Sequence, residues 1–82
     1  MQTTQKWLGK NTYGLCDMDT GEISINLYLF ICDVYLHENF HRQYPFWSET
    51  KVLKATARKL QRMSIVEIQE LGRKVLAQMK GV

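Results

Sequence analysis

The sequence has little of what marks several common classes of small protein. Among its 82 residues are only two cysteines, Cys16 and Cys32, and one proline. The two cysteines are not in a C-x-x-C spacing, which excludes the usual paired-cysteine metal and redox motifs. We expect both thiols to be free and buried in a reducing compartment, with a disulfide between them as the alternative.

Long apolar runs are also missing. The longest, residues 27–32, is far shorter than the roughly 20 residues that a helix needs to cross a bilayer. Residues 1–6 lack the apolar core of a signal peptide. We therefore expect a soluble cytoplasmic protein without a membrane partner.

Charge and length set further limits. The net charge of +3 permits acidic partners but does not single out nucleic acid. We expect residues 1–82 to form one domain with one core, as a monomer or weak homo-oligomer, with residues 1–5 disordered. A chain this short buries only roughly 60–65% of its unfolded surface, so a bound metal would add useful stability.

Alternating residues predict a β-hairpin in the first third of the chain. Residues 22–27 alternate strictly, with Ile23, Ile25 and Leu27 on one face. A second strand is expected over residues 13–17, because turn-forming residues separate it from the first. Residues 6–9 are a candidate third strand, so the sheet is either an antiparallel hairpin or a three-stranded meander.

A long apolar stretch follows the hairpin. Apart from Asp33, every residue from 27 to 36 is apolar, which predicts a central helix over about residues 28–43 that is covered on several sides. Asn26 is its expected N-cap, and Pro45 ends it.

Two further helices have capping signals. Ser48 is the expected N-cap of the first, and Ser64 forms a capping box with Glu67 at the start of the second, which Gly81 ends. The predicted fold class is therefore α+β: a small sheet packed on the central helix, followed by two helices.

The only two histidines lie on the central helix in the pattern H-E-x-x-H, at residues 37–41. His37 and His41 are four residues apart, so both can direct a nitrogen at one zinc ion. Glu38 is rotated from them by about a third of a turn, and it can reach a water on that ion. Zinc lowers the pKa of such a water towards about 7, and a carboxylate can take its proton during hydrolysis.

A catalytic zinc needs a third protein ligand and one open position. Glu49, in the first turn of the next helix, would return over the histidines if the chain reverses direction between them. Glu67 is the alternative third ligand, although its capping role competes. Asp33 lies one turn before His37. It is better suited to hold that histidine in position than to bind the ion itself. The two cysteines are weaker candidates.

Three stretches resemble the minimal zincins, which are small single-domain gluzincin-like zinc metallopeptidases of archaea, bacteria and phages. They are residues 13–26 (YGLCDMDTGEISIN), the H-E-x-x-H of residues 37–41, and residues 44–52 with the pattern Y-P-x-W-S-E-x-x-V. The likeness covers roughly residues 6–62. It implies a small antiparallel sheet laid against the active-site helix, followed by a helix that carries a glutamate ligand.

The resemblance also implies roles for individual residues. His37, His41 and Glu49 would bind Zn²⁺, and Glu38 would act as general base in peptide-bond hydrolysis. The substrate, a peptide or an unfolded protein, would bind as an added strand along a sheet edge. That edge would consist of Glu22, Ile23, Ser24, Ile25 and Asn26.

Two other functions remain open. One is a catalytically silent module, of phage or mobile-element type, whose zinc site only holds the fold. The other is a nucleic-acid-binding domain that uses the basic second helix and the third helix as a helix-turn-helix. The break at Met63-Ser64 lacks the glycine usual in that turn, so nucleic acid is the less favoured partner.

Overall fold

The protein combines a small sheet with three helices, as a computed structural model describes for residues 2–79. The elements are β1 (Thr3–Gln5), β2 (Gly14–Cys16), β3 (Ile23–Ile25), α1 (Leu27–Gln43), α2 (Glu49–Arg62) and α3 (Ile65–Gln78). This confirms the α+β class. The predicted helix end at Gly81 lies outside the described residues.

The sheet has the order β1-β3-β2 and is mixed. β2 and β3 form the predicted antiparallel hairpin, whereas β1 pairs parallel to β3, with Thr3 opposite Ile23. The meander is therefore wrong. Residues 3–5, which lie in the segment expected to be disordered, form β1. The chain does not continue as a strand through residues 6–9, because Trp7 leaves the sheet to pack against the helical core.

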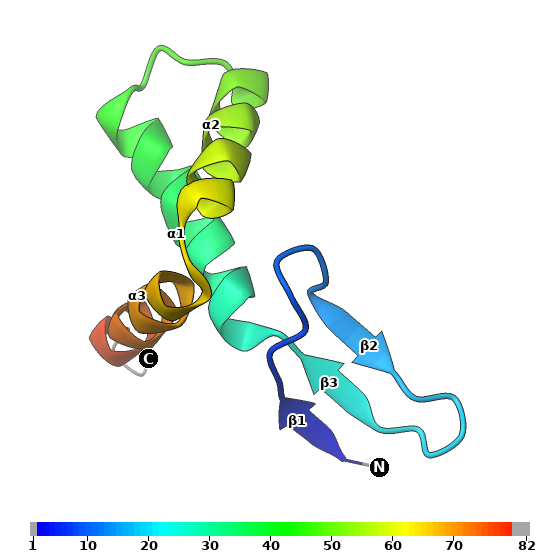
Figure 1. Cartoon of the computed structure of the whole chain (residues 1–82). Coiled ribbons are helices and arrows are strands. Elements are labelled where there is room, and N and C mark those ends of the chain that lie inside the picture. Colours follow the sequence, from blue (N-terminus) through cyan, green and yellow to red (C-terminus); the bar gives the residue numbers. More distant parts are fainter. Residues whose placement is uncertain (1, 80–82) are drawn as a thin grey trace.

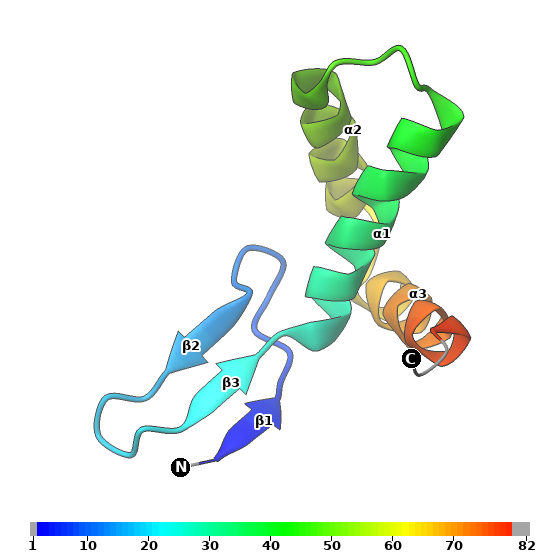
Figure 2. The same cartoon turned by 180° about the vertical axis from the view of Figure 1, so that it is seen from behind.

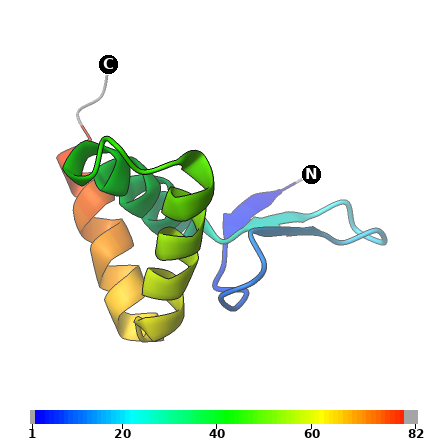
Figure 3. The same ribbon diagram turned by 90° about the horizontal axis from the view of Figure 1, so that it is seen from above.

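The sheet extends away from the helices at the N-terminal end of α1 instead of lying along that helix, as Figures 1 and 2 show and Figure 3 shows from above. All three residues of β2 are exposed. The radius of gyration is 14.4 Å, against about 12 Å for a compact chain of this length. The predicted packing of the sheet on the central helix is therefore wrong.

The loop between β1 and β2 makes the contact with the helices. The buried Asn26 side chain donates hydrogen bonds to the Gly9 and Thr12 carbonyls at 2.8 and 2.9 Å. Asn26 therefore does not cap α1 with its side chain, because it is already engaged in fixing this loop. The Tyr13 hydroxyl donates to the Asp33 carboxylate on α1.

The core lies where α1 crosses α2 and α3. The apolar side chains at its centre come from all three helices and the turn between α2 and α3: Leu29, Cys32, Leu36, Leu60, Met63 and Ile68. α1 and α3 approach closely because Gly72 lies against Tyr28. Ser48 and Ser64 both cap as predicted, Ser64 in a capping box with Glu67.

One side of α1 is not covered, contrary to the prediction of a helix buried on several sides. Phe30 and Val34 are 52% and 48% exposed, because α2 and α3 cover only the other sides and the sheet extends elsewhere (Figure 1). Among the described residues, no helix has the length and apolar character needed to cross a membrane.

Candidate metal centre

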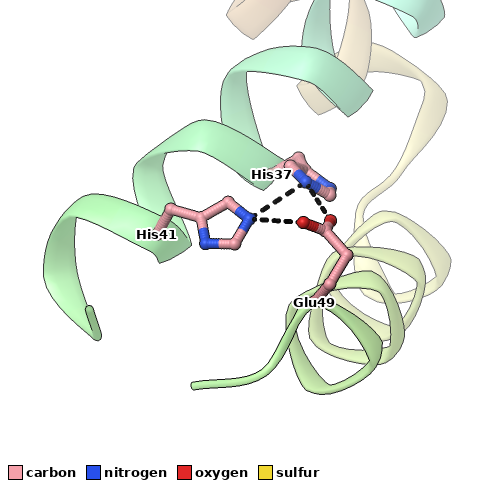
Figure 4. Close-up of side chains that lie close together, drawn as sticks. All are labelled: His37, His41 and Glu49. Carbon is pink, nitrogen blue, oxygen red and sulfur yellow. Dashed lines mark hydrogen bonds and ion pairs between the residues drawn. The ribbon is translucent and has the colours of Figure 1, made fainter. Parts of the chain in front are cut away.

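His37, His41 and Glu49 meet between α1 and the first turn of α2 (Figure 4). The two histidine Nε2 atoms lie 3.2 Å apart. Glu49 Oε1 lies 2.6 Å from His37 Nε2, and Glu49 Oε2 lies 3.2 Å from His41 Nε2. The structure therefore brings together the three residues that the sequence suggested as ligands.

These separations fit the donor set of a tetrahedral zinc ion. With bonds of about 2.05 Å, two ligands of such an ion lie about 3.3 Å apart. The two Nε2 atoms are 3.2 Å apart, and each approaches a different oxygen of the exposed Glu49 carboxylate, at 2.6 and 3.2 Å. Two imidazoles and one carboxylate are also a common ligand set of catalytic zinc sites.

The donor chemistry of the three side chains is that of a metal site. Each neutral imidazole has one nitrogen with a free lone pair, and an ionised carboxylate only accepts. A cation could therefore be bound by lone pairs of all three side chains, and Glu49 approaches the two Nε2 atoms with its two different oxygens.

The turn between α1 and α2 fixes the position of Glu49. Tyr44 donates its backbone N–H to the Phe40 carbonyl, and Trp47 donates to the Tyr44 carbonyl. The Tyr44 and Trp47 rings stack at 4.1 Å, nearly parallel at 8°. Ser48 then starts α2 by accepting from the Lys51 N–H. The chain reverses direction in this hydrogen-bonded turn, which returns Glu49 to the histidines.

Glu38 lies beside the group without belonging to it. Its Oε1 is 3.9 Å from His37 Nε2, and 70% of its side chain is exposed. The carboxylate is therefore accessible to a substrate or a water next to the three ligands. Its expected role as a proton acceptor stays a prediction.

The other candidate ligands are engaged elsewhere. The Glu67 carboxylate accepts the Ser64 backbone N–H at 2.9 Å, and hydrogen bonds from Ser64 lower the pKa of Glu67. The Cys32 thiol donates to the Ile68 carbonyl at 3.0 Å, and burial raises its pKa to about 11. Cys16 is exposed, contrary to the expectation of a buried thiol.

Asp33 is bound by Tyr13 and not by His37. Burial, the hydrogen bond to Asp33 and its charge raise the pKa of Tyr13 to about 12. Sequence reasoning missed this pair, because residues twenty positions apart meet only through the fold of the loop. The expected support of His37 by Asp33 is absent from the described contacts.

The predicted substrate strand is not a sheet edge. Residues 22–26 contain β3, which pairs with β1 on one side and β2 on the other. An added peptide strand therefore cannot pair with it, and the prediction is wrong on this point. The free edges of the sheet belong to β1 and β2.

Comparison with known proteins gives no relative that would assign this centre. No protein-family model, no curated protein and no solved structure matches the chain. The site is therefore interpreted from its own geometry.

Proposed function

We propose that the protein is a zinc-dependent peptide hydrolase of the minimal zincin type, with His37, His41 and Glu49 as metal ligands. The observation that carries the proposal is the convergence of two imidazole nitrogens and a carboxylate at separations of 2.6 to 3.2 Å. Glu38 beside them supplies the group that hydrolysis needs in addition to the metal.

Each side chain has a defined task. Bound zinc supplies Lewis acidity, which polarises a carbonyl and makes water acidic near neutral pH. The Nε2 atoms of His37 and His41 must be unprotonated to ligate. The Glu38 carboxylate takes a proton from the attacking water and then gives it to the leaving amine, so that it ends each cycle unprotonated.

The substrate is a peptide or an unfolded protein in extended form. Because β3 is enclosed, an added strand would pair with a free edge of the sheet, and β2 offers a fully exposed one. Backbone hydrogen bonds of this kind give affinity with little dependence on the peptide's sequence.

A zinc-stabilised module without turnover is the second candidate. The three ligands connect α1 to α2, so an ion there would hold two helices together in a chain with a small core. Folding stability would then be the ion's whole contribution.

Hydrolysis of denatured proteins by the zinc-loaded chain separates the two candidates. The peptidase proposal predicts cleavage by the wild type, no cleavage by Glu38→Gln, and equal zinc content in both. Glu70→Gln, at an exposed glutamate of α3, is the matched control and should cleave as the wild type does. Zinc binding without cleavage by any of the three would support the silent module and contradict the peptidase.

A further inference from the structure

A shallow apolar hollow of about 370 Å³ lies between α1 and the C-terminal part of α3. Its aliphatic and aromatic lining consists of Phe30, Ile31, Val34, Tyr35, Val75 and Met79. Phe30, Val34 and Met79 are each about half exposed. Contiguous exposed apolar side chains of this kind mark a binding surface, whereas isolated ones need no explanation.

Glu38 connects the hollow to the candidate metal centre. It is the one charged residue in the lining, and its Oε1 lies 3.9 Å from His37 Nε2. Phe30, Val34 and Glu38 are spaced four residues apart, so they form one row along α1 with about 5–6 Å between neighbouring Cβ atoms. The hollow therefore begins at the proposed base and extends from it towards the N-terminal end of α1.

The occupant of the hollow has to leave Glu38 able to act. A protein bound there permanently would cover this carboxylate, which is 70% exposed and which the proposed function needs accessible to water and substrate. A bound substrate meets the condition, because its scissile bond must lie within reach of the base in any case.

We propose that the hollow is the specificity pocket of the proposed peptidase and holds a large apolar side chain beside the scissile bond. The inference rests on the proposed function and adds the substrate class: unfolded chains cut next to leucine, phenylalanine or methionine. Ligand pockets span about 300–1,000 Å³, so this hollow suits one such side chain. An acidic side chain is disfavoured, because no cation lines the hollow among the described residues and Glu38 would repel it.

Phe30 is the position to change. It is half exposed, lies two turns from Glu38 and is neither a ligand nor the proposed base. Phe30→Lys places a cation in the apolar lining, and lysine is a good helix former. Val66→Lys is the matched control, since Val66 is 61% exposed on α3 and lies outside the hollow.

Cleavage of denatured casein by the zinc-loaded chain tests the proposal, with the cut sites read by mass spectrometry. The wild type and Val66→Lys should cut beside large apolar residues. For a peptide taken from such a site, alanine in place of the apolar residue should lower their kcat/KM about 10-fold or more. Phe30→Lys, with the same zinc content and circular dichroism, should cleave the two peptides with nearly equal kcat/KM.

The possible failures are distinguishable. Cut sites that share no apolar neighbour, or wild-type discrimination by Phe30→Lys, would overturn the pocket and leave the proposed peptidase activity intact. Absence of any casein cleavage by the zinc-loaded wild type would overturn the proposed function, and the pocket with it.

Discussion

Replacement of Gly72 by alanine tests the close crossing of α1 and α3. A Cβ at this position would lie 2.7 Å from Tyr28 Cβ, 2.9 Å from its Cα and 3.0 Å from its carbonyl oxygen. Alanine favours the helix by about 1 kcal/mol over glycine, whereas overpacking costs about 1–3 kcal/mol. Two of the three atoms are backbone, so relief requires one helix to move. We therefore take the upper cost, which leaves a net destabilisation of about 2 kcal/mol.

Urea unfolding and thermal melting measure this effect. A loss of about 2 kcal/mol lowers the Tm of a domain of this size by roughly 8–16 °C. Ala57→Gly, at an exposed position in the middle of α2, should cost about 1 kcal/mol and calibrates the propensity difference. Folded Gly72→Ala should still bind zinc as the wild type does, because Tyr28 lies about 13 Å along the helix from His37. A rise in Tm for Gly72→Ala would refute the close contact.

Two further predictions concern the metal and acid. Zinc at a free concentration 100 times its Kd should raise the unfolding free energy by about 2.7 kcal/mol, and hence the Tm by roughly 11–22 °C. In calorimetry Glu49→Ala should lose this zinc-induced rise in Tm, and Glu67→Ala should keep it. The reverse result would identify Glu67 as the third ligand. Hydrogen bonds from Ser64 hold the pKa of Glu67 below its ordinary value. Its contribution to stability is therefore complete above about pH 4.3 and is lost as the pH falls through the lower pKa of the folded state. Urea midpoints measured through that acidic range should fall less for Glu67→Gln than for the wild type, and an equal fall would contradict this assignment.

The helices and the meeting of His37, His41 and Glu49 could be predicted because their signals are local. Ser48 and Ser64 act within one turn of their own helices, and both cap as expected. His37 and His41 share a face by helical periodicity alone. Glu49 needed one assumption, a reversal of the chain between α1 and α2, and the turn at Pro45 makes that reversal.

The sheet could not be predicted in the same way. β1 is a short polar strand, and its partner β3 lies about twenty residues away with no local signal of parallel pairing. Trp7 lies in a stretch that was a candidate strand, and only the packing of the loop places it against the core. The exposed side of α1 could not be predicted from the sequence either. An apolar sequence predicts burial, but it does not tell whether the chain or a partner supplies the cover.

The most direct test of the metal centre is zinc stoichiometry by native mass spectrometry. Our account predicts one zinc ion per chain for the wild type and for Glu38→Gln, and none for His37→Ala or Glu49→Ala. Circular dichroism on the same samples confirms that the variants are folded. A folded wild type that takes up no zinc, or folded His37→Ala and Glu49→Ala that retain it fully, would contradict the assignment.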